Sequence, residues 1–409
     1  MKKTNTTQMN LLIIGAGHYT TGSTSLSGLK ATDKDYGVFL PSILELRRRG
    51  VIDSIFLAGR DGRKIPSLKE KVSAMTKLFG WGNDIEYFPS AKVVDEHAYR
   101  KALKLLAKPG VVLIATPDAT HKQIILDVIE AGFHFMVVKP VVVKMKDLKE
   151  IQHAMDKRGV LGMVDYHKVY DEANLILKHD YENKKYGDLQ HVFSKMTQRR
   201  DMLTIFKKWA GKDGHNINHY LGSHYIHMVG YITGATPLSV RATCQYGVAQ
   251  KKYKINTPDL IETQIVWQAK NGTSFTSYHV SGWADPSETS GMTYQELHLI
   301  GTKGHVKSDQ RDRGFETVLA GEGQKITNPY FYNLNTAFVG SGAFDSKYGF
   351  KSVCTFVEAA LDVENGKTPK TFDLNLPTIK DSLCVTAILE AADKSLASGS
   401  KVIDIHSLK

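Results

Sequence analysis

Short continuous apolar runs alternate with helically spaced segments over the first 165 residues. Strands covered on both faces of a parallel sheet are expected to read as unbroken apolar runs. Such runs predict strands at residues 10–14, 54–58, 111–115, 133–138 and 160–164. Apolar positions three to four residues apart predict helices at residues 38–49, 66–78, 99–107, 121–131 and 144–158. The alternation indicates an α/β protein with a doubly wound parallel sheet.

From about residue 187 the pattern changes to a period of two. Residues 189–194, 262–267 and 273–278 alternate between apolar and polar side chains. Such alternation is typical of antiparallel strands with one covered face. Apolar helices predicted at 220–232 and 378–397 are expected to cover that face. A large open sheet whose other face also carries apolar residues predicts self-association, as a dimer or tetramer.

Composition narrows the class of protein. The chain has 409 residues, of which 42% are hydrophobic, so we expect two domains with sizeable cores. The net charge of +11 is dispersed, and its longest cluster, Arg47-Arg48-Arg49, complements the dipole at a helix end. We therefore expect neither nucleic-acid nor membrane binding. The polar N-terminus and three scattered cysteines favour a cytoplasmic protein with reduced thiols.

A tight turn follows the first predicted strand. Gly15-Ala16-Gly17 fits the start of the phosphate-binding pattern G-x-G-x-x-G, but Thr20 stands where the third glycine belongs. A polar stretch then continues to Gly37 before the next helix begins. The turn between strand and helix therefore carries an insertion, which we expect beside the cofactor phosphates or the substrate.

Several motifs at consistent spacing resemble one family. They are Ala115-Thr116-Pro117-Asp118-Ala119-Thr120-His121, then Val138-Lys139-Pro140, Tyr220-Leu221-Gly222-Ser223-His224 and Gly301-Thr302-Lys303-Gly304. Together they are similar to the glucose–fructose oxidoreductase/inositol dehydrogenase (Gfo/Idh/MocA) family. The resemblance implies a Rossmann domain, here residues 1–142, and an α/β domain for substrate binding and oligomerisation, here residues 143–409. It also implies a nicotinamide cofactor, held by Gly15, Gly17, His18, Arg60, Thr116, Pro117, His121 and Lys139, and a sugar or cyclitol substrate.

Candidate catalytic residues follow from the same motifs. Lys139 matches the lysine of the family's Glu-Lys-Pro motif, although Val138 replaces the glutamate. A lysine at the carboxyl end of a parallel strand is well placed for proton transfer. His224 matches the histidine of Asp-x-x-x-His, with Tyr220 in place of the aspartate. Residues four apart share a helix face, so Tyr220 and His224 are expected to share one site, unless they only bond to each other inside the protein.

Substrate and metal ligands are less clearly marked. His167 and Lys168 follow the strand at 160–164, and we interpret them as donors to sugar hydroxyls, beside Tyr220 and His224; a solvated turn is the alternative. His215, Asn216, His219 and His227 crowd one segment. Because no cysteine or carboxylate completes a clear ligand set there, we predict no metal.

Cofactor preference depends on the residues after the second strand. An acidic residue at this place holds the ribose of NAD, whereas Gly59-Arg60 leaves room for the 2′-phosphate of NADP and a cation to pair with it. The sequence therefore favours NADP slightly. If the register differs by two residues, Asp61 takes the acidic position and indicates NAD.

Three functions remain open at this point. The leading hypothesis is an NAD(P)-dependent dehydrogenase for a secondary alcohol of a sugar, sugar derivative or cyclitol. The second is a glycosidase that uses the same redox step transiently, as some members of the family do. The third is a cofactor-binding sensor without activity, favoured by the lost motif residues and opposed by the retained Lys139 and His224.

Overall fold

A six-stranded parallel sheet forms the first layer of the computed structural model. The model describes residues 7–22, 36–314, 316–320, 323–326, 328, 330–331, 345 and 347–408. The strands lie in the order β3-β2-β1-β4-β5-β6, and this order reverses between β1 and β4. Their bounds are β1 Met9–Ile14, β2 Ile52–Ala58, β3 Glu86–Phe88, β4 Gly110–Ile114, β5 His134–Val137 and β6 Gly162–Val164. The expected doubly wound sheet is confirmed.

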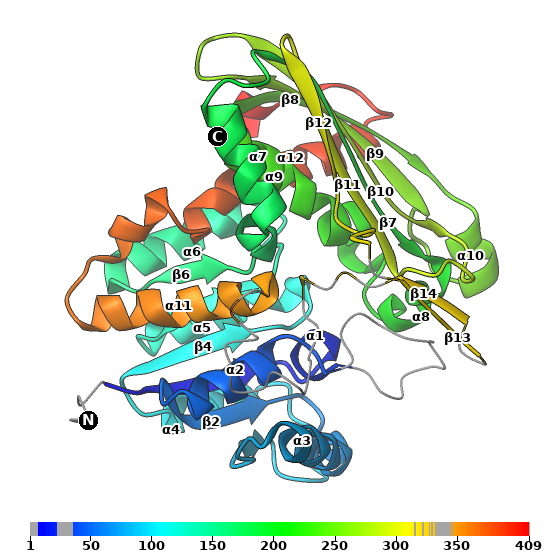
Figure 1. The fold of residues 1–409 in the computed structure, drawn as a ribbon. Helices are drawn as coiled ribbons and strands as arrows, with labels where there is room; N and C mark the ends of the chain where they lie inside the picture. Colours follow the sequence, from blue (N-terminus) through cyan, green and yellow to red (C-terminus); the bar gives the residue numbers. More distant parts are fainter. Residues whose placement is uncertain are drawn as a thin grey trace.

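Helices cover both faces of this sheet, as the unbroken apolar runs require. On β1, Leu11 and Ile13 face one buried cluster and Leu12 and Ile14 the other. The first cluster includes α2 (Phe39–Arg48), α3 (Ile65–Phe79) and α11 (Tyr348–Glu364). The second includes α4 (Ala98–Leu105), α5 (His121–Glu130) and α6 (Met145–Arg158). Figure 1 shows α11, which comes from the C-terminal part of the chain, lying against the first sheet near α2.

The second sheet has seven strands in the order β12-β11-β7-β10-β9-β8-β15. Only β7 and β10 pair in parallel, so the expectation of a mostly antiparallel sheet is confirmed. Its strands are β7 Leu189–Arg199, β8 Thr236–Gln245, β9 Leu260–Gln268, β10 Ser274–Asp285, β11 Thr293–Gly301, β12 Gly304–Asp309 and β15 Ile403–Asp404. A separate hairpin pairs β13 (Glu316–Leu319) with β14 (Gly323–Ile326).

The remaining α-helices among the described residues are α1 His18–Thr21, α7 Glu172–Glu182, α8 Leu203–Phe206, α9 Ser223–Thr233, α10 Val248–Tyr253 and α12 Ser382–Ala397. In Figure 1, α7, α9 and α12 cover the side of the second sheet that faces the first, as expected for the two apolar helices. The expected start of α9 at residue 220 is wrong, because residues Asn218–Gly222 form a π-helical turn before it.

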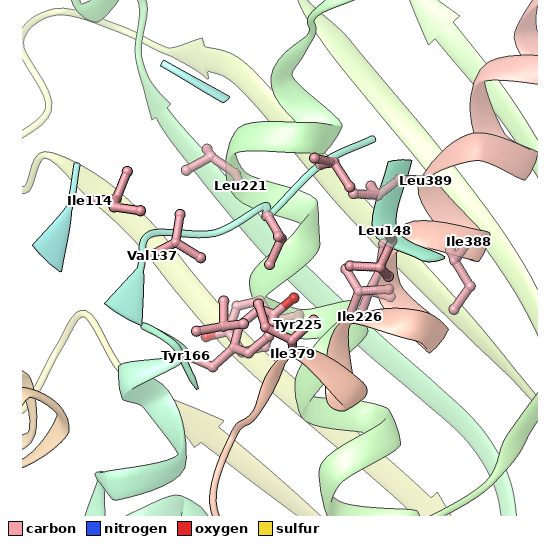
Figure 2. Close-up of a cluster of buried hydrophobic side chains, with 14 of the residues drawn as sticks. Ile114, Val137, Leu148, Tyr166, Leu221, Tyr225, Ile226, Ile379, Ile388 and Leu389 are labelled. Atoms are coloured by element: carbon pink, nitrogen blue, oxygen red, sulfur yellow. The ribbon is translucent and has the colours of Figure 1, made fainter. Parts of the chain in front are cut away.

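One apolar core joins the two halves. Ile114 and Val137 of the first sheet, Leu148 of α6, Ile226 of α9 and Ile388 of α12 belong to the same buried cluster (Figure 2). The boundary expected at residue 142 lies between β5 and β6 of one sheet, so the sheet itself continues beyond it. The division into two domains at that point stays a prediction.

Two further expectations concern the surface. Along β10, Thr276, Tyr278 and Val280 are at least partly exposed and alternate with buried neighbours, so they share one face of the second sheet. Self-association through this face stays a prediction. Within the described part of the chain, no helix is both long and apolar enough to span a membrane. The three cysteines, Cys244, Cys354 and Cys384, are half-buried and form no disulfide.

Candidate active site

The turn after β1 lies where the strand order reverses, at the carboxyl ends of β1 and β4. Gly15 has φ of +110°, and a Cβ there would lie 2.3 Å from the carbonyl oxygen of Ala115, so this position requires glycine. Gly17 is exposed, and a Cβ at this residue would meet no heavy atom within 4 Å. The turn is therefore tight on the side of the sheet and open on the side of solvent. These features fit the pyrophosphate of a dinucleotide, which needs close approach to the backbone at this edge.

The absence of the third glycine has a structural explanation. Thr20 is buried in the short helix α1, and its Oγ1 donates to the carbonyl oxygen of Gly15 at 2.6 Å. The chain returns from the insertion at Gly37, where a Cβ would lie 2.5 Å from the backbone of Thr20. The amide of Val38 then donates to the carbonyl of Tyr19 at 2.7 Å. Thus α2 begins directly beside α1, and the lack of a side chain at Gly37 allows the two backbones to pack closely.

The residues after β2 resolve the register on which cofactor preference depends. Since β2 ends at Ala58, Gly59 is the first residue beyond it, and a Cβ there would lie 3.4 Å from the Cβ of Ala16. Arg60 is 61% exposed and lies 3.6 Å from Glu96. Asp61 instead caps a 3₁₀ turn and pairs with Arg63 at 2.8 Å, and this hydrogen bond lowers the pKa of Asp61 to about 2. Gly59, not Asp61, therefore lies beside the turn.

His121 connects the loop after β4 with the loop after β5. The two ring nitrogens of His121 lie 2.9 Å from the carbonyl oxygen of Thr116 and 3.0 Å from that of Pro140. The side chain is fully buried, and this burial lowers its pKa. We expected His121 to bind the cofactor, but its ring is enclosed by protein. It holds Thr116 and the Lys139–Pro140 segment in place instead.

The other expected cofactor residues lie around the turn and the β4 loop. His18 is the first residue of α1, directly after Gly17. Thr116 follows β4, and its Oγ1 accepts a hydrogen bond from Oγ1 of Thr120 at 2.9 Å. Pro117 precedes the 3₁₀ turn Asp118–Thr120. These residues share the carboxyl edge of the sheet with Gly15 and Gly17.

Lys139 follows β5 at the same edge and contacts the second half of the protein. Its Nζ donates to the carbonyl oxygen of Tyr220 and lies 4.4 Å from the centre of the Tyr220 ring. The side chain is only half-buried. Tyr220 belongs to the π-helical turn before α9, and such turns recur at functional sites. The structure thus brings the expected Lys139 and Tyr220 together.

A second group of side chains surrounds His224. Its ring centre lies 5.2 Å from that of His167, and both side chains are more than 90% buried. The Nδ1 atom of His167 lies 3.3 Å from the hydroxyl of Tyr19 and 3.7 Å from Asp165. Tyr19 donates to Asp165 as well. Tyr19 of α1, Asp165 and His167 therefore form one connected polar group next to His224 of α9.

Asp165 is the charged residue at the centre of this group. Burial would raise its pKa, but His167 and the hydroxyls of Ser352 and Tyr19 lower it overall. Sequence reasoning did not find Tyr19, because it lies in the polar insertion that follows Gly17. It assigned no role to Asp165, which lies two residues before His167. The signal for Asp165 was available, since it follows a buried parallel strand directly.

Lys168 lies in a different environment from the one we expected. It is only 2% exposed, and its Nζ donates at 2.6 Å to both Gln295 and Gln310. Gln310 in turn donates to Asp171, which also pairs with Arg313. An ammonium enclosed in this way has no route to a sugar hydroxyl. The expectation that Lys168 binds substrate is therefore not supported by its surroundings.

The histidine-rich segment before Tyr220 meets a carboxylate from the first half. Asp118, in the loop after β4, lies 3.0 Å from His215 and accepts from the indole of Trp209. His219 lies 3.1 Å from Asp393 of α12. The prediction of no metal depended on the lack of a carboxylate near these histidines. Sequence spacing gave no sign of Asp118, which lies 97 positions before His215.

Comparisons with known proteins agree with this architecture. The model of the oxidoreductase family Gfo/Idh/MocA, with an NAD-binding Rossmann fold, matches residues 76–166. Among solved structures, the myo-inositol 2-dehydrogenase of Lactobacillus plantarum is similar with a TM-score of 0.69 at 16% identity, covering 97% of this chain and 99% of that one. The scyllo-inositol dehydrogenase of Lactobacillus casei with bound NAD(H) and scyllo-inositol gives 0.68 at 15% identity, covering 98% and 100%.

Relatives found by sequence have higher identity to this chain, two of them over only part of it. An uncharacterized oxidoreductase of Schizosaccharomyces pombe is 28% identical over 38% of this chain and 41% of its own length. The scyllo-inositol 2-dehydrogenase (NADP(+)) IolW of Bacillus subtilis is 24% identical over 36% of this chain and 40% of its own length. The chain thus spans about two fifths of these two relatives. The uncharacterized oxidoreductase YrbE of Bacillus subtilis is 25% identical over 88% of this chain and 98% of its own length.

Proposed function

We propose that this chain is an NAD(P)-dependent dehydrogenase for a secondary alcohol of a sugar, sugar derivative or cyclitol. The chain belongs to the Gfo/Idh/MocA oxidoreductase family and has its NAD-binding Rossmann fold. The observation that carries the proposal is the placement of Lys139. A half-buried ammonium lies at the carboxyl edge of the parallel sheet, held by the carbonyl and ring of Tyr220. Ligands of open α/β sheets bind at this edge.

The cofactor site is supported by the chain's own backbone. Gly17 leaves open space beside the turn, and Gly59 keeps the neighbouring position free of a side chain. When bound there, the nicotinamide cofactor supplies the two-electron redox chemistry. Gly59 presents no carboxylate to a 2′-phosphate, and the exposed guanidinium of Arg60 is available to pair with one. We therefore assign a preference for NADP.

Lys139 manages the proton of the substrate hydroxyl in this proposal. An ammonium has three donors, and the Tyr220 carbonyl takes one of them. The contact positions Nζ at the sheet edge, where open α/β sheets bind their ligands. General acid–base catalysis by a positioned group of this kind contributes roughly 10²–10⁴-fold to a rate. Lys139 therefore donates the proton to, or receives it from, the oxygen of the reacting carbon.

His224 and His167 form the second part of the proposed site. Their rings lie 5.2 Å apart, and His167 leads to the Tyr19–Asp165 pair. The carboxylate of Asp165 is stabilised in its charged form and lies 3.7 Å from Nδ1 of His167. We assign His224 to the substrate and His167 to the relay behind it. Tyr220, in place of an aspartate, contributes its ring and carbonyl to Lys139.

A screen of polyols tests the proposal. The purified protein is incubated with sugars and cyclitols, including myo- and scyllo-inositol, in the presence of NAD or NADP. We expect at least one polyol to increase the absorbance of the reduced nicotinamide, more with NADP than with NAD. Cofactor binding by calorimetry without turnover on any polyol would favour a sensor. Cleavage of a glycoside without net reduction of the cofactor would favour a redox-assisted glycosidase.

A further inference from the structure

Three buried residues from distant parts of the chain converge beside the proposed site. Asp118 belongs to the loop after β4, and His215 and His219 precede Tyr220. Each offers one donor atom, and these atoms lie within 4.8 Å of one another. The exposed fractions of Asp118, His215 and His219 are 7%, 5% and 1%. Residues of this type and burial are the usual ligands of a divalent transition metal.

The atoms that face one another lack hydrogen bonds. Among the described residues, none forms a hydrogen bond with Asp118 Oδ2, His215 Nδ1 or His219 Nδ1. Nδ1 of His215 lies 3.0 Å from Oδ2 of Asp118 as an ion pair. Buried polar atoms are almost always paired. Three such atoms in one cluster need a common partner, and a cation meets all of them at once.

The other polar atoms of the cluster are already held. Oδ1 of Asp118 accepts from the indole of Trp209 and from the amide of Ala119 at 3.1 Å. The carboxylate of Asp393 lies 3.1 Å from Nε2 of His219. A hydrogen bond from Nε2 to this carboxylate leaves the lone pair of the imidazole on Nδ1. This is the outer-shell arrangement that fixes the tautomer and orientation of metal-binding histidines.

We propose that Asp118, His215 and His219 bind one divalent transition-metal ion, and we take zinc as the representative ion. Zinc takes imidazole nitrogen and carboxylate oxygen at about 2.0–2.2 Å, and two histidines with one carboxylate form a known three-ligand set. The cluster is already assembled, so small movements of the three side chains complete the coordination. The cluster contains no cysteine, and imidazole with carboxylate ligands suits divalent ions such as zinc.

The position of the cluster indicates what the ion does. Asp118 lies two residues after Thr116 on the cofactor side, and His219 precedes Tyr220, whose carbonyl holds Lys139. The ring of Trp209, which donates to Asp118, lies 6.2 Å from that of Tyr220. An ion bound here would tie the β4 loop to the segment that positions Lys139. It therefore acts as a clamp between the two halves of the site.

Metal binding is measured without any substrate, so its result is independent of the proposed activity. The full-length protein is stripped with a chelator, dialysed against zinc and analysed for metal per chain after gel filtration. We expect one zinc ion per chain in the wild type and none in His219→Gln or His215→Gln. Asp393→Asn keeps the three ligands and removes the outer carboxylate charge, so affinity should fall by about 10–100-fold.

His227→Gln is the matched control, because His227 is another buried histidine of the same region that lies outside the cluster. It should retain the full zinc content. Wild-type protein that binds no more zinc than His219→Gln would overturn the proposal and leave an Asp118–His215 ion pair. Equal loss in His227→Gln would also overturn it. Should the ligand variants fail to fold by circular dichroism, cobalt(II) titration of the wild type decides, and the absence of a visible ligand-field band overturns the site.

Discussion

Two lysines occupy equivalent places after neighbouring parallel strands, yet their surroundings differ. Lys139 follows β5 and Lys168 lies four residues beyond β6. Each ammonium lies close to a tyrosine ring, at 4.4 Å from Tyr220 and 5.0 Å from Tyr225. Sequence reasoning assigned both lysines to the active site for the same reason. The structure separates them by what encloses each ammonium.

Lys139 belongs to an exposed edge, and Lys168 to a closed polar network. Lys139 Nζ donates to a backbone carbonyl, and the side chain stays half-exposed. Lys168 has two amide oxygens as acceptors, and Gln310 passes the interaction on to Asp171. A buried charge persists only when its donors are satisfied, whereas a group for proton transfer must keep a place for substrate. A lysine whose ammonium is buried and hydrogen-bonded therefore indicates a role in stability. A lysine whose ammonium is partly exposed indicates a role in proton transfer.

Replacing Lys139 should give the largest effect. Lys139→Met keeps the apolar stem and removes the amine, so we expect turnover to fall by roughly 10²–10⁴-fold with little change in cofactor affinity or unfolding. Steady-state kinetics on the substrate identified by the screen provides the measurement. His224→Ala should impair the same step. The loss of turnover in the double variant should not exceed the sum of the two single losses in activation free energy. Near-normal turnover of Lys139→Met would remove Lys139 from the mechanism.

The same substitution at Lys168 should have the opposite signature. Lys168→Met removes the donor of Gln295 Oε1, whereas Gln310 Oε1 still accepts from the hydroxyl of Tyr225 at 3.0 Å. A buried unsatisfied acceptor costs about 1–3 kcal/mol, so we expect the free energy of unfolding in urea to fall by about that amount while the folded fraction keeps its kcat. A loss of kcat without a loss of stability would break the comparison and return Lys168 to the active site.

The glycine turn tests the exposed edge in a different way. Gly17→Val meets open space and an ordinary φ of −83°, so the fold should survive. A bulky side chain blocks the backbone approach of the pyrophosphate, and we expect the affinity for both NAD and NADP to fall by about 10–100-fold in calorimetry. Gly15→Val is the contrasting variant, since its φ of +110° and the nearby Ala115 carbonyl should impair folding itself. Unchanged cofactor affinity in Gly17→Val would place the pyrophosphate elsewhere.

The smallest expected effect concerns Arg60. Its guanidinium is 61% exposed, so a charge-assisted bond to a 2′-phosphate is screened by solvent. We expect Arg60→Ala to weaken NADP binding by roughly tenfold and NAD binding hardly at all. The ratio of the two dissociation constants is the quantity to compare. Equal losses for both cofactors, or a strong preference of the wild type for NAD, would contradict the assignment of NADP.

Much of the first sheet was predictable from local pattern. The apolar runs predicted five of the strands to within a few residues. A strand covered on both faces needs apolar side chains on both, so its sequence is a continuous apolar run. β3, with only three residues, lacked such a run. Gly15 and Lys139 were found for the same reason, since the carboxyl end of a parallel strand is a position that chain order alone identifies.

The sequence by itself thus determined the two kinds of sheet, the glycine turn and the strand ends at which chemistry is expected. Only the tertiary structure decided which polar side chains meet. It brought Asp118 to His215, placed Tyr19 on Asp165, and enclosed Lys168 between Gln295 and Gln310. The periodicity of apolar residues indicates which face of a helix or strand is buried, because each element carries this pattern within its own short segment of sequence. Pairing between these buried polar groups joins positions 97 to 146 residues apart, and the free energy that selects it exists only once the elements have packed.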